Sequence, residues 1–191
     1  MGLTGGIGAG KSEALAALAR LGAATLSTDA VVHELYRNPD VRDAVVARWG
    51  DEVAPDGVVD RAAVARRAFA APGERAWLEQ LLWPRVGARV AAWREEAGAS
   101  GPRALVVETP LLFEAGMDAA YDATIAVIAD EAVRARRAAA SGYAAMDERA
   151  ARQLTQEEKA ARADHVVRND RDLAALEREL AAVLEKLERT A

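Results

Sequence analysis

The sequence contains no cysteine and only two histidines, His33 and His165, among its 191 residues. Without cysteine, the chain can form no disulfide, use no thiolate nucleophile and build no cysteine-ligated zinc site. The two histidines lie far apart in the sequence, so we expect no zinc site built on imidazoles either. Carboxylates, hydroxyls, lysines, arginines and backbone amides are therefore the groups that can carry chemistry.

Long apolar runs are also missing, because no stretch approaches the roughly 18 apolar residues of a membrane-spanning helix. No basic segment followed by an apolar one opens the chain, as a secretory signal would. Positive charge is in deficit, with 25 Lys and Arg against 30 Asp and Glu. This balance argues against broad binding to nucleic acids or anionic membranes. We expect a cytoplasmic protein with small-molecule partners, acting as a monomer or weak homo-oligomer.

Hydrophobic residues make up 51% of the chain, which is enough for a sizeable core. Continuous apolar runs separated by helical patterns are typical of strands buried on both faces of a parallel sheet. Five short segments fit this description: 2–4, 23–26, 104–108, 123–129 and 165–168. We therefore predict one α/β domain over residues 1–191, a three-layer sandwich around a mainly parallel sheet.

Helical spacing of apolar residues predicts the remaining elements. One helix begins at Lys11 and stops at Gly22, and another carries a leucine stripe from Leu173 to Leu187. Between residues 30 and 98 the chain is rich in alanine and arginine, with no strand signal. Three interruptions punctuate that region, at Pro39, at 55–57 and at 72–73. We expect residues 30–98 to form a helical lobe beside the sheet.

The segment GGIGAGKS at residues 5–12 fits the pattern G-x-x-x-x-G-K-[ST] at every fixed position. Glycines let a phosphate approach the backbone, whose N–H groups form an anion-binding nest at a helix N-terminus. Lys11 can bridge the β- and γ-phosphates, and Ser12 can offer its hydroxyl to Mg²⁺. A strand before and an amphipathic helix after disfavour the alternative, a glycine-rich turn with an accidental lysine. The predicted ATP-binding residues here are Gly6, Ile7, Gly8, Ala9, Gly10, Lys11, Ser12 and Glu13.

Two acids follow predicted strands, and each has two interpretations. Asp29 can accept a proton from an acceptor hydroxyl or hold a metal-bound water, because strand ends carry the site in a doubly wound sheet. It can equally be an N-cap of the following helix, as can Ser27 and Thr28. Glu108 resembles a magnesium-orienting carboxylate, and the alternative is a solvated strand end.

The segment after Glu108, TPLLFE, offers Pro110, Leu111 and Leu112 as candidate acceptor contacts, although such apolar residues are more often core. Residues 132–146 contain Arg134, Arg136 and Arg137 and no acid. An arginine-bearing segment after a strand can close over a triphosphate and stabilise the charge during transfer. We expect a lid over residues 134–150, with a solvated helix face as the alternative.

Taken together, the ordered motifs resemble the dephospho-CoA kinase family over nearly the whole chain. The similarity rests on GLTGGIGAGKS at 2–12, DGVVDRAAVARRAF at 56–69, LLWPRV at 81–86, ETPLLFEAGM at 108–117 and RQLTQEEKAARADHVVRND at 152–170. This resemblance implies a P-loop kinase of the nucleoside-monophosphate-kinase type, with a helical acceptor-side lobe and a lid. It implies transfer of the ATP γ-phosphoryl, with Mg²⁺, to the ribose 3′-hydroxyl of dephospho-CoA.

The same resemblance implies roles for individual residues. Asp29 would be the catalytic acid–base residue and part of the acceptor site, with Lys11 and Arg137 acting on the transferring phosphate. The acceptor site would also include Glu108, Pro110, Leu111 and Leu112. Three further residues would contact ATP: Arg134, Arg149 and Asn169.

The sequence departs from the family pattern at four places. Ser27 stands where the family usually has the first acid of Asp-x-Asp, and Trp83 replaces the His of a His-Pro pair. Glu13 follows Lys-Ser where Thr is frequent, and a second lid arginine is missing near Ser141. Two rival functions follow: another small-molecule P-loop kinase, or an ATP-binding protein with little catalysis. A GTPase is disfavoured, because no Asn-Lys-x-Asp segment is present.

Overall fold

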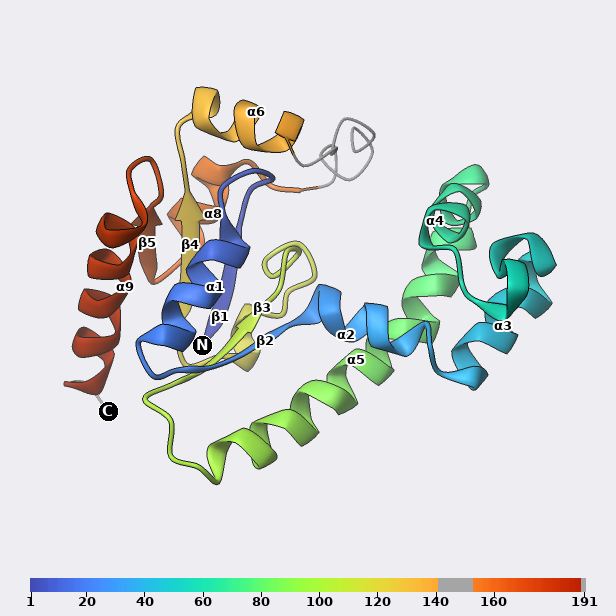
Figure 1. Ribbon diagram of the computed structural model, residues 1–191, viewed down its shortest axis with the longest axis horizontal. Coiled ribbons are helices and arrows are strands. Elements are labelled where there is room, and N and C mark those ends of the chain that lie inside the picture. The colour runs from blue at the N-terminus through green and yellow to red at the C-terminus, as the bar shows by residue number, and fades with distance from the viewer. Residues whose placement is uncertain (141–152, 190–191) are drawn as a thin grey trace. The chain divides into compact units, whose positions relative to one another are not determined.

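The computed structural model describes residues 1–140 and 153–189. The chain divides into two compact units, which we call the sheet unit (Met1–Ser27 and Arg94–Ala191) and the helical unit (Thr28–Trp93). Figure 1 gives the element labels used below.

The sheet unit is built on five strands in the order β2-β3-β1-β4-β5, and every neighbouring pair is parallel. Each strand falls on one of the five predicted segments, so the predicted parallel sheet is confirmed. The bounds are β1 Gly2–Gly5, β2 Ala24–Ser27, β3 Leu105–Glu108, β4 Thr124–Ile128 and β5 His165–Arg168. Because all five strands run the same way, their carboxyl ends lie along one edge of the sheet.

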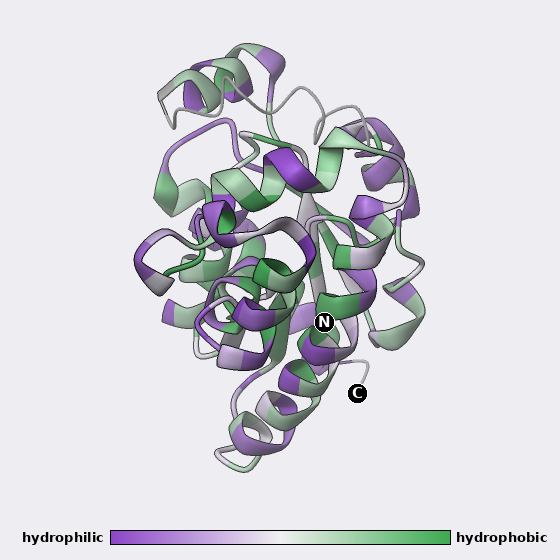
Figure 2. Cartoon of the chain, turned by 90° about the vertical axis from the view of Figure 1, so that its right-hand side faces the viewer, coloured by the Kyte–Doolittle hydropathy of each residue, from purple (hydrophilic) through white to green (hydrophobic). Residues whose placement is uncertain are grey.

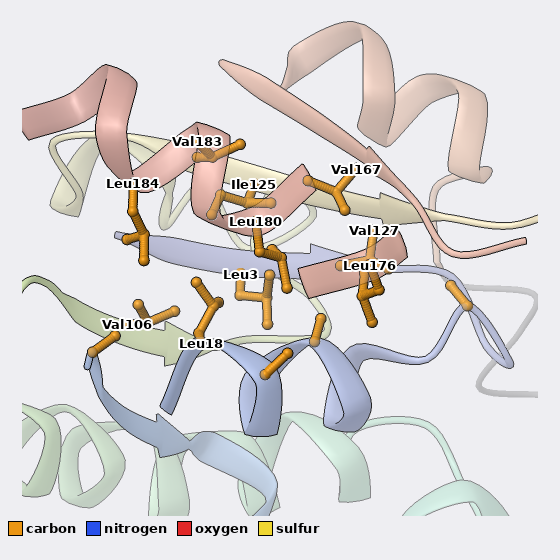
Figure 3. Packing of buried hydrophobic residues seen from close by; sticks show 14 residues of the cluster. Leu3, Leu18, Val106, Ile125, Val127, Val167, Leu176, Leu180, Val183 and Leu184 are labelled. Carbon is orange, nitrogen blue, oxygen red and sulfur yellow. The ribbon is translucent and has the colours of Figure 1, made fainter. Parts of the chain in front are cut away.

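Helices α1 (Lys11–Arg20) and α9 (Leu173–Glu188) pack on each other and on one face of this sheet. Leu18 of α1 and Leu180 of α9 are fully buried against Leu3 and Ile125 of the strands (Figure 3). Side chains alternate between the two faces of a strand, so Thr4 points the opposite way from Leu3. On that second face Thr4 meets α8 (Gln156–Arg162).

Helix α6 (Glu131–Ala140) follows β4 and lies beside the loop that joins β1 to α1. A short 3₁₀ turn at Asp118–Ala120 precedes β4. Figure 2 shows that helices carry both hydrophilic and hydrophobic residues, as expected for elements with one buried face. No helix in the described part of the chain is long and apolar enough to cross a membrane.

The helical unit has its own buried cluster, which includes Val41, Val45, Val53 and Val64. Its helices are α2 (Thr28–Leu35), α3 (Pro39–Trp49), α4 (Arg61–Ala70) and most of α5 (Glu74–Gly98), with 3₁₀ turns at Asp51–Val53 and Pro55–Gly57. The three predicted interruptions are confirmed. Pro39 opens α3, residues 55–57 form a 3₁₀ turn, and residues 72–73 separate α4 from α5.

Candidate active site

The loop between β1 and α1 sits at the carboxyl edge of the sheet and has the geometry of an anion cradle. Gly10 is the N-cap of α1 in the left-handed conformation (φ 89°), so the free N–H groups of the first turn follow it directly. The ammonium of Lys11 folds back to donate to the carbonyl of Gly6 at 3.2 Å. The helix N-terminus and this ammonium together give the loop a positive field.

Two glycines of this loop are required by their surroundings. Gly8 has a φ of 74°, and a Cβ built on it would lie 2.5 Å from the Arg134 carbonyl oxygen. Gly10 has a φ of 89°, and a Cβ there would collide with the side-chain amide of Asn169. Both positions combine a backbone conformation that favours glycine with a close neighbour, so the sequence pattern has a steric cause.

Arg134 of α6 contacts the loop directly. Its Nε donates to the Ile7 carbonyl at 3.0 Å, and its Nη1 pairs with Glu131 at 2.7 Å. A Cβ built on Gly6 would lie 3.3 Å from the same guanidinium. The structure therefore brings a predicted ATP-binding arginine next to the predicted phosphate loop.

Arg137 and Asn169 form a second contact behind the loop. Asn169 follows β5 and is 2% exposed, and its side-chain amide donates to the Ala9 carbonyl at 3.0 Å. The Arg137 guanidinium donates to the Asn169 backbone carbonyl at 3.0 Å. Asn169 thus holds the loop and Arg137 at once, although they are far apart in the sequence.

Glu108 and Ser27 meet at the ends of two neighbouring strands. The β2–β3 register pairs these two residues directly, and Ser27 Oγ donates to Glu108 Oε2 at 2.5 Å. Only 5% of Glu108 is exposed, so the interpretation of Glu108 as a solvated strand end is wrong. A short hydroxyl–carboxylate hydrogen bond of this kind is charge-assisted and fixes the direction of the carboxylate.

The segment after Glu108 leads back under the sheet edge. The Pro110 carbonyl accepts hydrogen bonds from Lys159 Nζ at 2.6 Å and from Thr4 Oγ1 at 3.3 Å. Leu111 is partly exposed, whereas Leu112 is fully buried and its methyl groups lie beside Gly2. Leu112 therefore has the placement of a core residue, whereas Pro110 and Leu111 are only partly buried.

Asp29 is an exposed residue in the first turn of α2. The helix begins at Thr28, so Asp29 lies inside it and is not its N-cap. It belongs to the helical unit, and it follows Ser27 of β2 by only two residues in the chain. Its predicted catalytic role stays a prediction.

Ser12 and Glu13 are exposed residues in the first turn of α1, where both backbone N–H groups face the helix N-terminus. Arg136 lies on α6 with the other two arginines. Arg149 and Ser141 fall outside the described residues, as does most of the predicted lid segment 134–150 beyond Ala140.

Local sequence patterns predict neither the connection between Ser27 and Glu108 nor the buried position of Lys159. A signal for the first exists, because both residues end predicted strands and the carboxyl ends of parallel strands share an edge. The strand order that makes β2 and β3 neighbours cannot be read from local patterns. For Lys159, nothing local distinguishes it from a solvated helix residue.

Comparison with known proteins gives consistent matches along the chain. The pattern of the family described as dephospho-CoA kinase matches residues 1–175. A dephospho-CoA kinase of Deinococcus radiodurans is 39% identical, with 100% of this chain and 93% of that protein covered. A crystal structure of TT1252 from Thermus thermophilus is 34% identical with a TM-score of 0.78, covering 97% and 96% of the two chains. A dephospho-CoA kinase from Campylobacter jejuni, 20% identical with a TM-score of 0.61 over 99% and 96%, shares the fold.

Proposed function

Since the chain belongs to the dephospho-CoA kinase family, we propose which of its residues perform the phosphorylation of dephospho-CoA by ATP. The chain is a transferase of coenzyme A biosynthesis with a P-loop kinase fold. The observation that carries the proposal is the packing of Arg134, Arg137 and Asn169 around the loop 6–10 and Lys11. That arrangement gathers three cationic side chains at one helix N-terminus, as a triphosphate requires.

On the ATP side, the backbone of residues 6–13 cradles the phosphates at the start of α1. Lys11 releases the Gly6 carbonyl and binds the transferring phosphoryl group. Arg137, held by Asn169, stabilises the charge that spreads over the phosphoryl oxygens during transfer. Arg134 covers the opposite side of the loop through Ile7 and contacts ATP there, and Arg149 adds a further cation from the lid.

On the acceptor side, the helical unit and the segment 108–112 bind dephospho-CoA. Asp29 accepts the proton of the ribose 3′-hydroxyl while the oxygen of that hydroxyl attacks the γ-phosphorus. The bond between that phosphorus and the β,γ-bridging oxygen breaks, and ADP leaves. Glu108, Pro110 and Leu111 line the acceptor site, with Leu112 supporting them from the core. Phosphoryl transfer requires little covalent chemistry from the protein, whose main task is to align the acceptor hydroxyl with the γ-phosphorus.

Magnesium fits the residues at this edge of the sheet. Ser12 presents an exposed hydroxyl next to Lys11, and Glu108 presents a buried carboxylate oriented by Ser27. These are oxygen ligands of the kind that Mg²⁺ prefers, and the ion usually keeps several waters besides. When bound with ATP, Mg²⁺ neutralises phosphate charge. We assign Ser12 as its protein ligand, with Glu108 orienting its waters.

The proposal also covers the partners, the location and the oligomeric state. The enzyme uses ATP and dephospho-CoA in the cytoplasm, without a nucleic acid or membrane partner, as a monomer or weak homo-oligomer. The hydrogen bond between Ser27 and Glu108 argues against the rival function, that of an ATP-binding protein with little catalysis. Although position 27 carries no acid, β3 supplies a carboxylate at the same register position, which supports a catalytic site.

The first test is ADP release with ATP and Mg²⁺, measured with and without dephospho-CoA, with the product identified by mass. We expect ADP release that depends on the acceptor and a product heavier by one phosphate. Phosphorylation of another nucleotide instead would favour the rival kinase. Tight ATP binding with no transfer to any acceptor would favour the binding protein.

Asp29→Asn tests the acid–base assignment. We expect turnover to fall by about 10²–10⁴-fold, the usual contribution of a general base, while the Kd for ATP changes less than about twofold. Asp43→Asn, an exposed acid of α3 paired with Arg42, is the matched control in the same unit. Unchanged turnover in Asp29→Asn would remove Asp29 from the mechanism.

A further inference from the structure

Lys159 is a buried cation that the proposed mechanism does not use. It lies on α8 with 0% of its surface exposed, the largest side chain among those fully buried in the described residues. The other two lysines of the sequence are Lys11, in the phosphate loop, and Lys186, on the exposed side of α9. A lysine is almost never fully buried unless it is paired, so its surroundings need an explanation.

The Lys159 ammonium reaches three acceptors from two separate segments. Its Nζ lies 2.8 Å from Glu114 Oε1, 2.6 Å from the Pro110 carbonyl and 3.3 Å from Thr4 Oγ1. An ammonium has three protons to donate, so this set satisfies the group completely. Burial lowers the pKa of Lys159, and the hydrogen bond with Glu114 opposes that shift.

Pro110 and Glu114 begin and end the segment PLLFE, so Lys159 holds both of its ends. The Pro110 carbonyl accepts a second hydrogen bond from Thr4 at 3.3 Å. Glu114 Oε1 also accepts from the backbone N–H of Leu154 at 2.8 Å, just before α8. Helix α8 is itself fixed by a capping box between Thr155 and Glu158. The segment is therefore anchored to β1 and to α8 at once.

Stability alone explains this arrangement poorly. Burying an ion pair costs desolvation energy that its own attraction often fails to offset, and apolar replacements of similar shape are frequently as stable. The hydrogen bonds instead fix the direction of a short backbone segment that begins two residues after Glu108. Two of the three acceptors of Lys159, Pro110 and Glu114, belong to the acceptor-side segment, and none lies in the phosphate loop 6–10. The third acceptor, Thr4, lies in β1 and gives the longest of the three contacts, 3.3 Å.

We propose that Lys159, paired with Glu114, is a positioning residue that sets the Pro110–Leu111 backbone for the acceptor and so governs affinity for dephospho-CoA rather than for ATP. This inference rests on the proposed acceptor site. According to this inference, the buried pair of Lys159 and Glu114 affects the binding of dephospho-CoA and not the binding of ATP. The loss of Lys159 would leave the Pro110 carbonyl with its Thr4 hydrogen bond only.

Lys159→Met, which keeps the length of the side chain and removes its charge and donors, is the first variant. We expect its KM for dephospho-CoA to rise about tenfold or more, the scale of a lost hydrogen bond to a charged group. Its KM for ATP should change less than about twofold. Lys186→Met is the matched control, and both KM values should stay as in the wild type.

Two further variants separate positioning from stability. Glu114→Gln keeps the shape of the partner, retains Lys159, and should show the same selective rise in the acceptor KM in a protein that folds. Lys159→Met/Glu114→Gln removes both charges, so its melting temperature should recover toward the wild type while its acceptor KM stays high. Equal rises in both KM values, or a lowered melting temperature with unchanged KM values, would overturn the proposal.

The assay of the wild-type protein comes first, because it tests the proposed phosphorylation of dephospho-CoA separately from the positioning role of Lys159. If wild-type ADP release does not depend on dephospho-CoA, the proposed function fails. If it does depend on the acceptor and Glu114→Gln leaves both KM values unchanged, only the positioning role fails.

Discussion

At the scale of single residues, Lys11 is the side chain for which we expect the contribution to catalysis to exceed the contribution to stability. Its ammonium bonds to the Gly6 carbonyl at 3.2 Å in a partly exposed position. We expect Lys11→Ala to lower turnover by about 100-fold or more, as the loss of one preorganised donor to transition-state charge does. The free energy of unfolding should change by less than about 1 kcal/mol, as for most surface substitutions.

Turnover by coupled ADP release and unfolding by urea test both halves of this prediction. Lys186→Ala removes the same charge from α9 and should leave both unchanged. A Lys11→Ala protein with near wild-type turnover would contradict the assignment. One that unfolds at much lower urea would show that the lysine is structural.

The Ser27–Glu108 hydrogen bond predicts an unusual result for an apparently conservative change. The family resemblance implies an Asp at position 27, yet Ser27→Asp would set two carboxylates opposite each other in the β2–β3 register. Like charges directly opposite are destabilising. We expect Ser27→Asp to be less stable and less active than Ser27→Ala, which loses about 1–3 kcal/mol by leaving the buried Glu108 carboxylate without this donor.

A double-mutant cycle measures the coupling. Ser27→Asp/Glu108→Gln restores a single carboxylate with a donor beside it, so its urea midpoint should exceed that of Ser27→Asp. Additive effects of the two substitutions would show that the residues do not act as a pair. The urea midpoint is the first readout, and kcat with Mg²⁺ is the second.

At the scale of elements, the packing of α1 and α9 on the sheet forms most of the core of the sheet unit. Leu180 of α9 is 0% exposed and lies in one cluster with Leu18 and Leu3 (Figure 3). We expect Leu180→Ala to lower the free energy of unfolding by about 2–5 kcal/mol, through lost burial and the cavity left behind. Leu173→Ala, an exposed leucine of the same helix, is the control and should cost far less.

Elements were predictable from the sequence where the signal is local. The strand segments, the helix after Lys11 and the interruptions at Pro39 and 72–73 depend on neighbouring residues, and all match the structure. The same holds for the phosphate loop, whose glycines meet a local backbone requirement. Strand order is not local, so the meeting of Ser27 with Glu108 and of Lys159 with Pro110 could not be predicted.

The end of β2 and the start of α2 differ from the prediction for the same reason, because strand pairing is not a local property. Ser27 is the last residue of β2 and directly precedes α2, because the pairing with the parallel strand β3 extends to Glu108. That extension starts α2 at Thr28 and places Asp29 in its first turn. By its chemistry alone Leu112 could be a core residue or an acceptor contact, and the structure shows that it is fully buried beside Gly2.

At the scale of the whole molecule, the net charge of −5 means that anion binding must depend on a few local clusters of cations. Arg134, Arg137 and Lys11 are three such groups, gathered from distant segments of the chain by the parallel sheet. ATP with Mg²⁺ should therefore stabilise the protein by linkage, by about 2.7 kcal/mol at 100 times its Kd.

Two titratable groups near the amino ends of β4 and β5 contribute to stability in acid. Asp164 accepts hydrogen bonds from the Thr124 side chain at 2.7 Å and backbone at 2.8 Å, and these lower the pKa of its carboxyl below the ordinary 3.8. A lowered carboxyl pKa contributes stability above 3.8 that is lost as the pH falls toward the folded-state pKa. Burial and nearby Lys186 lower the pKa of His165 below 6.5. As the pH falls, the His165 imidazole therefore binds a proton in the unfolded state before it does so in the folded state. The stability of the folded state falls below pH 6.5 as a result.

We therefore expect the melting temperature to decline in two windows, one beginning below pH 6.5 and one below pH 3.8. His165→Gln should flatten the first window, because it removes the imidazole whose pKa is lowered in the folded state. Asp164→Asn should lower stability at pH 7, where its hydrogen bonds are intact, and flatten the second window. Thermal melts of the three proteins between pH 7 and pH 3 measure both slopes. Parallel curves for wild type and Asp164→Asn would show that acid unfolding begins at other carboxylates.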